Sequence, residues 1–113
     1  MSLQQLFDRS LNITRELIRI DSVNPTLVKG AVGEKPIAEF LQRFLRNEGI
    51  SSELQEVAPG RFNVISSIRG VRPGPRVLLN GHLDTVSVAG MSHPFDPFLK
   101  EGKIHGRGSQ DMK

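Results

Sequence analysis

The sequence predicts an α/β fold in which helices pack on a mixed central sheet. Three observations support this prediction: two segments with helical spacing of apolar residues come first, candidate strands follow them, and one strand is apolar throughout. A chain of 113 residues is long enough for one domain with a buried core. No repeat, low-complexity tract or internal linker divides the chain.

Two helices are predicted in the first half of the chain. Residues 3–20 carry a helical stripe of leucine and isoleucine, and the stretch Asp21–Thr26, which contains a proline, ends it. The second helix is expected over residues 34–48, with a proline in its first turn and Gly49 as its C-cap. Its apolar face consists of Ile37, Phe40, Leu41, Phe44 and Leu45.

Strands are predicted in the second half. Residues 51–57 and 62–68 are strand candidates, and residues 69–75, with two glycines and two prolines, form a turn. Arg76–Leu79 is the strongest strand prediction, because a short continuous apolar run is typical of a buried inner strand. Residues 98–105 are expected to form a short hairpin.

Composition excludes several classes of protein. The absence of cysteine excludes disulfide scaffolds, thiol nucleophiles and cysteine-based metal sites. The net charge of +3 comes from scattered basic residues, and no aromatic residues alternate with them, so we expect no nucleic-acid partner. No apolar stretch reaches the length of a membrane span, and no signal peptide is visible, so we expect a cytoplasmic location.

The segment Gly81–Val86 holds the first candidate site residues. If the apolar strand continues to Asp84, then His82 and Asp84 point to the same face, because side chains alternate along a strand. Both would lie at the carboxyl end of a buried strand, where open α/β sheets bind ligands. A neutral imidazole can bind zinc, and a nearby carboxylate commonly orients it. A surface pair or a satisfied buried hydrogen bond would account for the same two residues.

The second candidate is Asp111, which follows a loop with two glycines, Gly106 and Gly108. Glycines allow positive φ angles or a close backbone approach. A carboxylate at this place can bridge two metal ions through its two oxygens. The residues alone favour a simpler interpretation, in which Asp111 is the N-cap of a following helix.

Taken together, the two segments resemble the dinuclear zinc hydrolases that include acetylornithine deacetylase, succinyl-diaminopimelate desuccinylase, the aminoacylases and glutamate carboxypeptidase. The resemblance rests on Gly81–Val86 as Gly-His-x-Asp-x-Val and on Gly106–Lys113 as Gly-Arg-Gly-x-x-Asp-Met-Lys. The two motifs occur in the family's order and at its spacing. Pro94–Pro97 and Ser22–Pro25 also match elements typical of this family, so the resemblance covers essentially the whole chain.

The resemblance implies roles for three residues. His82 corresponds to a terminal ligand of one metal ion, Asp84 to the carboxylate that orients this histidine, and Asp111 to the carboxylate that bridges two ions. Two zinc ions are expected in a complete site, and cobalt or manganese could be accepted. The implied reaction is hydrolysis of an amide bond in an N-acyl amino acid or a small peptide, with metal-activated water as the nucleophile.

The resemblance also implies that residues 1–113 are the N-terminal segment of a zinc-exopeptidase-like catalytic domain. The family pattern continues with a general-base glutamate, further metal ligands and a lid or dimerisation domain, so the 113-residue chain is expected to be inactive alone. Homo-oligomerisation, or association through an exposed sheet edge, is expected as well. The alternative is a non-catalytic interaction or folding module that retains the hydrolase scaffold.

Overall fold

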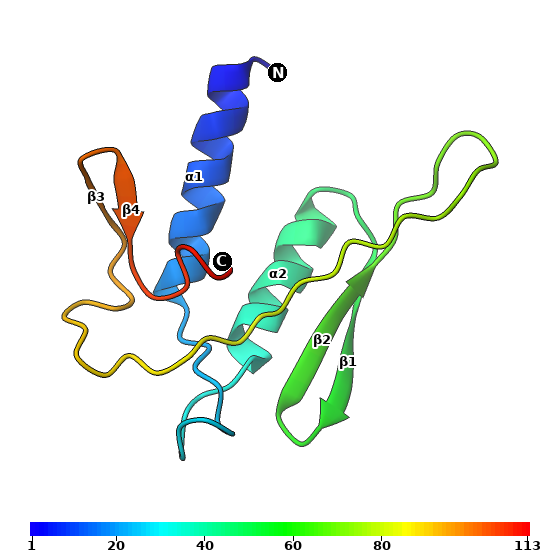
Figure 1. Ribbon diagram of the computed structural model, residues 1–113. Coiled ribbons are helices and arrows are strands. Elements are labelled where there is room, and N and C mark those ends of the chain that lie inside the picture. The colour runs from blue at the N-terminus through cyan, green and yellow to red at the C-terminus, as the bar shows by residue number, and fades with distance from the viewer.

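The computed structural model describes residues 1–113 and contains two helices followed by four strands (Figure 1). The elements in order are α1 (Leu3–Arg19), α2 (Lys35–Asn47), β1 (Ser52–Ala58), β2 (Arg61–Ser66), β3 (Phe98–Lys100) and β4 (Lys103–His105). The strands form two separate antiparallel pairs, β1–β2 and β3–β4, rather than one continuous sheet. The α/β class predicted from the sequence is confirmed.

Helix α1 begins with a capping box and lies mostly open to solvent. The Ser2 hydroxyl accepts a hydrogen bond from the Gln5 backbone N–H at 3.1 Å, and the Gln5 side chain accepts one from the Ser2 N–H at 2.8 Å. Ile18, near the C-terminal end, is the one buried residue of the helix, whereas Leu3 is 86% exposed. Figure 1 shows the N-terminal half of α1 projecting away from the other elements. Neither helix has the length and apolar composition that crossing a membrane requires.

Helix α2 packs against the β1–β2 hairpin and supplies the main core. Ile37 and Ala38 are the buried residues of α2, and the helix contacts both strands. Glu34, which is buried just before the helix, forms an ion pair with the half-buried Arg61 at the start of β2. The ion pair raises the pKa of the Arg61 guanidinium above its ordinary value. It therefore fastens the start of α2 to the hairpin.

The β1–β2 hairpin confirms both strand predictions within a few residues. Ser52 pairs with Ser66 and Leu54 with Val64 in an antiparallel register. The register shifts near the turn, where Gly60 has a φ of 73° that favours glycine. The hairpin β3–β4 also lies where the sequence predicts it, with Phe98 paired to His105.

The predicted inner strand Arg76–Leu79 is not formed, and this prediction is wrong for the present chain. Val77, Leu78 and Leu79 are 82%, 88% and 91% exposed. No neighbouring segment of the chain makes ladder hydrogen bonds with them, so the run is extended but is neither paired nor covered. Figure 1 shows the chain after β2 first projecting away from the body as a loop and then returning across the molecule past α2 toward the site.

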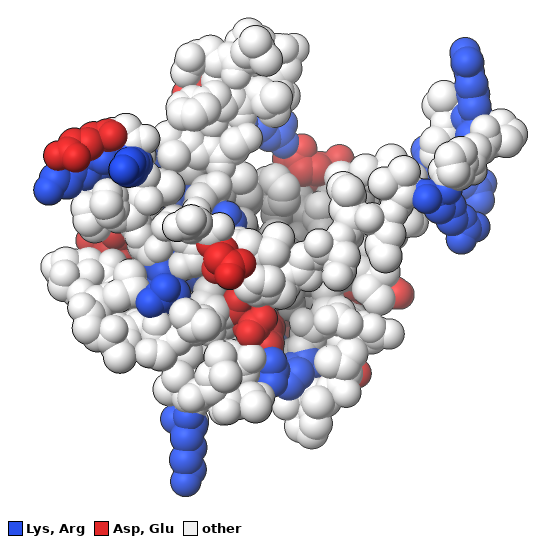
Figure 2. All heavy atoms as spheres, in the orientation of Figure 1, with Lys and Arg blue, Asp and Glu red and all other residues white.

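The projecting loop after β2 carries a cluster of exposed arginines. Figure 2 shows Lys and Arg side chains gathered where the loop projects, and the arginines of this stretch are Arg69, Arg72 and Arg76. All three are exposed. The cluster lies away from the pocket described below, so it is a solvated surface feature.

A short parallel bridge joins the segment after α1 to the segment after the exposed run. Val23 pairs with Thr85, and both are buried. The Asn24 N–H donates to the Thr85 carbonyl and the Thr85 N–H to the Ser22 carbonyl, each at 2.9 Å. This bridge fixes where His82 and Asp84 lie.

Candidate functional site

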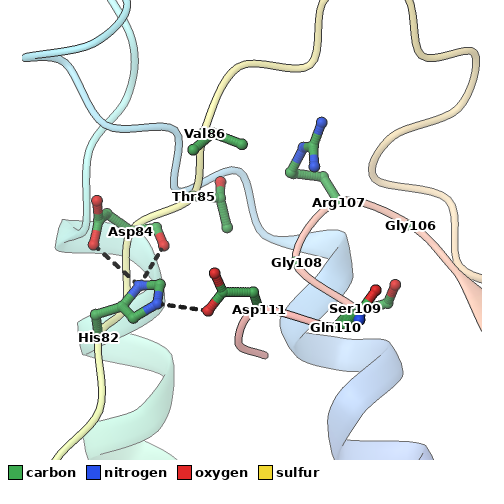
Figure 3. Close-up of a pocket in the computed structure, with 10 residues that line it drawn as sticks. All are labelled: His82, Asp84, Thr85, Val86, Gly106, Arg107, Gly108, Ser109, Gln110 and Asp111. Carbon is green, nitrogen blue, oxygen red and sulfur yellow. Dashed lines mark hydrogen bonds and ion pairs between the residues drawn. The ribbon is translucent and has the colours of Figure 1, made fainter.

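Two loop segments line a pocket of about 520 Å³ that is open to solvent. One wall is residues 82–86, lacking Leu83, and the other is the glycine loop 106–111 (Figure 3). The three site residues predicted from the sequence, His82, Asp84 and Asp111, all line this pocket. The fold thus brings together residues that are 29 positions apart in the chain.

His82 has an oxygen atom opposite each ring nitrogen. Its Nδ1 lies 2.9 Å from the carbonyl oxygen of Asp84 and 3.3 Å from the Oδ1 atom of the same residue. Its Nε2 lies 2.8 Å from Oδ1 of Asp111. The hydrogen bond to Asp111 raises the pKa of His82 above its ordinary value, and the carbonyl and charge of Asp84 act in the same direction, against the effect of burial.

Asp84 is held on the side away from His82 as well. Its Oδ2 atom accepts a hydrogen bond of 2.8 Å from Nδ2 of Asn24. The Asp84 side chain is 28% exposed, compared with 45% for His82. The carboxylate therefore lies between the amide of Asn24 and the imidazole ring of His82.

Asp111 reaches the pocket through the glycine loop. Gly106 passes so close to α1 that a Cβ atom there would lie 2.4 Å from Cγ2 of Ile18, so a larger residue would force either the loop or the Ile18 side chain to move. The Arg107 N–H donates to the Pro94 carbonyl at 2.7 Å and holds the loop in place. The carboxylate of Asp111 contacts His82 rather than a backbone N–H, and its side chain is 82% exposed.

These donors fit part of a metal site. An imidazole nitrogen and a carboxylate oxygen are ligand types that zinc takes, and two ligands at about 2.0–2.2 Å from one ion can lie roughly 3 Å apart. The separation of 2.8 Å between Nε2 of His82 and Oδ1 of Asp111 is close to that value. No group of three or more His, Cys, Asp or Glu residues with the geometry of a metal site occurs in the chain.

Other polar groups near the pocket serve the scaffold. Nζ of Lys113 donates to the Ile20 carbonyl at 2.6 Å, and burial lowers the pKa of Lys113 to about 8. His105 stacks on Phe98 with 4.7 Å between ring centroids, and His93 is exposed in a loop. Neither of these histidines lines the pocket.

Two features of the site are not visible as motifs in the sequence. One is the hydrogen bond from Asn24 to Asp84, and the other is the ion pair between Glu34 and Arg61 that braces the neighbouring loop. The place of Asn24 before Pro25 indicates a local turn, in which the asparagine side chain commonly bonds the backbone two residues on. It does not indicate the bond to Asp84. No sequence signal singles out Arg61 as the partner of Glu34.

Comparison with known proteins agrees with the resemblance. Residues 78–113 match the model of peptidase family M20/M25/M40, and this range includes His82, Asp84 and Asp111. An uncharacterised metallohydrolase of Methanocaldococcus jannaschii is 32% identical over 94% of this chain and 29% of its own length. Mouse aminoacylase-1 is 36% identical over 92% of this chain and 26% of its own length. Acetylornithine deacetylase of Proteus mirabilis is 33% identical over 91% of this chain and 27% of its own length.

The chain spans less than a third of the length of each of these relatives. The aligned parts nevertheless cover more than nine tenths of the chain, well beyond the two motifs. The chain is therefore a homologue of the proteins of peptidase family M20/M25/M40.

Proposed function

We propose that residues 1–113 are the N-terminal segment of the catalytic domain of a metal-dependent amide hydrolase. The proposed substrates are N-acyl amino acids or small peptides, as the names of the relatives aminoacylase-1 and acetylornithine deacetylase suggest. The observation that carries the proposal is the convergence of His82 Nε2 and Asp111 Oδ1 at 2.8 Å, with Asp84 behind the ring.

Each residue has a distinct role in this proposal. His82 would bind one metal ion through Nε2, and Asp111 would bridge two ions through its two carboxylate oxygens. Asp84 would accept the Nδ1–H of His82 and so keep the lone pair of Nε2 directed into the pocket. Zinc is the proposed metal, with cobalt or manganese as substitutes, and the bound ions would polarise the substrate carbonyl and acidify a water molecule.

The chain itself is proposed to have no hydrolytic activity. His82 and Asp111 supply two metal donors, whereas a catalytic zinc ion normally has three protein ligands. A general base is typically worth about 10² to 10⁴ in rate, and the resemblance assigns that role to a glutamate outside these residues.

A cytoplasmic location and association through exposed strand surface stay predictions.

Calorimetric titration of the 113-residue chain with zinc tests the proposal. We expect binding that is lost in both His82→Ala and Asp111→Ala, because each variant removes one of the two converging donors. Matched controls are His93→Ala and Asp96→Ala, two exposed residues of the same types that do not line the pocket. Both controls should bind zinc as the unchanged chain does.

Two results would count against the proposal. Absence of zinc binding by the unchanged chain, or binding that is indifferent to both site variants, would favour a scaffold without metal chemistry. The non-catalytic folding or interaction module would then be the better description.

A further inference from the structure

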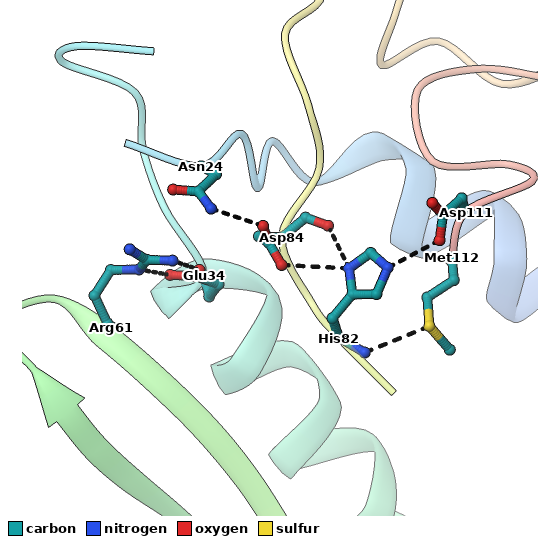
Figure 4. A network of polar contacts seen from close by, with 7 residues as sticks. All are labelled: Asn24, Glu34, Arg61, His82, Asp84, Asp111 and Met112. Atoms are coloured by element: carbon teal, nitrogen blue, oxygen red, sulfur yellow. Dashed lines mark hydrogen bonds and ion pairs between the residues drawn. The ribbon is translucent and has the colours of Figure 1, made fainter. Parts of the chain in front are cut away.

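The side chain of Asn24 has a different partner at each end of its amide group, and Figure 4 shows the end that meets Asp84. Oδ1 accepts a hydrogen bond of 2.8 Å from the Thr26 backbone N–H, and Nδ2 donates one of 2.8 Å to Oδ2 of Asp84. The orientation of the amide is fixed, because only its oxygen can accept the N–H of Thr26 and only its nitrogen can donate to a carboxylate. Asn24 therefore faces Asp84 with its NH₂ group and not with its oxygen.

The backbone around Asn24 is held from two sides. The bridge between Val23 and Thr85 is buried, and the Asn24 N–H itself donates to the Thr85 carbonyl. On the other side, Nη1 of Arg61 donates to Oγ1 of Thr26 at 3.0 Å. Pro25 further restricts the conformation that Asn24 can adopt. The donor that meets Asp84 thus comes from a rigid frame.

We propose that Asn24 is a positioning residue, whose amide holds the Asp84 carboxylate so that Oδ1 faces Nδ1 of His82. The inference deepens the proposed function, because Asp84 is the group that would orient the metal-binding histidine. It assigns to the loop after α1 a part in the site that neither motif contains. Its test uses the metal-free chain and so does not depend on hydrolysis.

The proton of a neutral His82 ring is the quantity that Asn24 would influence. Both ring nitrogens face oxygen atoms, yet a neutral imidazole has one N–H to donate. With Oδ1 of Asp84 in place, two oxygens of Asp84 compete for the proton against one oxygen of Asp111. If Asp84 turns away, only its backbone carbonyl remains at Nδ1, and the proton shifts toward Nε2. That tautomer has no lone pair on the nitrogen that faces the pocket.

The test is the tautomer of His82 in the metal-free chain. It is read from the ¹⁵N shifts of the ring nitrogens at one fixed pH where the imidazole is neutral. The variant Asn24→Asp is isosteric and keeps the oxygen that accepts the Thr26 N–H, but it replaces the donor by a second negative charge. We expect it to move Asp84 away and to raise the fraction of the Nε2–H form. Asn63→Asp on β2, whose amide donates to Gln55 at 3.2 Å, is the matched control and should leave the tautomer unchanged.

A pair of exchanged residues shows whether Asn24 acts through Asp84. In Asp84→Asn alone, the new amide would present its oxygen to Asn24 and its NH₂ group to Nδ1 of His82, so the Nε2–H form should again increase. In the double variant Asn24→Asp with Asp84→Asn, the donor and acceptor are exchanged. The amide at position 84 can then donate to position 24 and accept the Nδ1–H of His82. We expect the original tautomer to return.

Three results would overturn the proposal: no change in Asn24→Asp, an equal change in the Asn63→Asp control, or failure of the exchanged pair to restore the tautomer when both single variants alter it. If Asn24→Asp does not fold, as judged by the Thr85 amide signal, Asn24→Ser decides. Its shorter hydroxyl adds no charge and should raise the Nε2–H fraction in the same way. If the unchanged chain does not bind zinc, the proposed function is rejected, but the result on the His82 tautomer still stands.

Discussion

Helix α2 has an apolar face and the run Val77–Leu79 is apolar throughout, yet one is buried and the other is exposed. Ile37 and Ala38 of α2 are 1% and 0% exposed, whereas Leu78 is 88% exposed. Helix α2 is followed along the chain by a hairpin that turns back at Gly60 and covers its face. The run 77–79 has no strand beside it. An apolar pattern indicates what a segment can bury, and the neighbouring segments decide whether it does so.

The largest expected effect separates these two regions by stability. Ile37→Ala should lower the free energy of unfolding by about 2–5 kcal/mol, because it leaves a cavity where a fully buried side chain was. Leu78→Ala should change it by no more than about 0.5 kcal/mol, because the side chain is already in solvent. Urea unfolding followed by circular dichroism measures both values. Equal losses in the two variants would mean that the exposed run is packed in solution.

The next effect concerns what covers the exposed run. An unpaired extended segment with an apolar surface is a template for association, so the chain should self-associate in sedimentation velocity at concentrations on the order of tens of micromolar. Leu78→Lys should shift the chain toward monomer. Leu3→Lys is the matched control, because Leu3 is equally open at 86% but lies on α1. If the unchanged chain is monomeric, the exposed run Val77–Leu79 does not drive self-association.

The smallest expected effect is on the pKa of His82. This residue lies only three positions after the exposed run, in the segment that lines the pocket. Asp111→Asn should lower the pKa of His82 toward its ordinary value, because it removes the largest cause of the upward shift. A raised pKa means that protonated His82 stabilises the fold below about pH 6.5 and that this stabilisation is lost as the pH rises through the folded-state pKa. NMR titration of the ring protons measures the shift directly.

Asp96→Asn is the control for this titration, since Asp96 is an exposed aspartate outside the pocket. It should leave the pKa of His82 unchanged. A His82 pKa that is equally unchanged in Asp111→Asn would mean that the two side chains do not meet in solution.

The parts of the fold that the sequence predicts are those decided by nearby residues. The bounds of α1 and α2 follow from helical spacing, Pro25, Pro36 and Gly49. The two hairpins follow from alternation and turn residues within a few positions. Arg76–Leu79 fails because a strand needs a partner that no local pattern specifies.

The candidate site shows the same division. His82, Asp84 and Asp111 are recognisable because they belong to two compact motifs, and the structure brings them to one pocket. Their metal-binding roles stay predictions. Asn24 belongs to the Ser22–Pro25 element, but its bond to Asp84 spans 60 positions, and the bond between Glu34 and Arg61 spans 27. Contacts of this range depend on the three-dimensional path of the chain.

The bridge between Val23 and Thr85 has a consequence for the chain as a polymer. It closes a loop of about 60 residues, and the entropy lost on closing such a loop corresponds to about 3–4 kcal/mol. That cost is met once, within a single molecule, as long as the intervening chain is continuous. A proteolytic cut after Arg69, Arg72 or Arg76 in the projecting loop would leave all the pocket residues on one piece and Val23 and Asn24, which hold Thr85 and Asp84, on the other. The contacts from Val23 to Thr85 and from Asn24 to Asp84 would then depend on the concentration of those pieces, as contacts between any two separate molecules do.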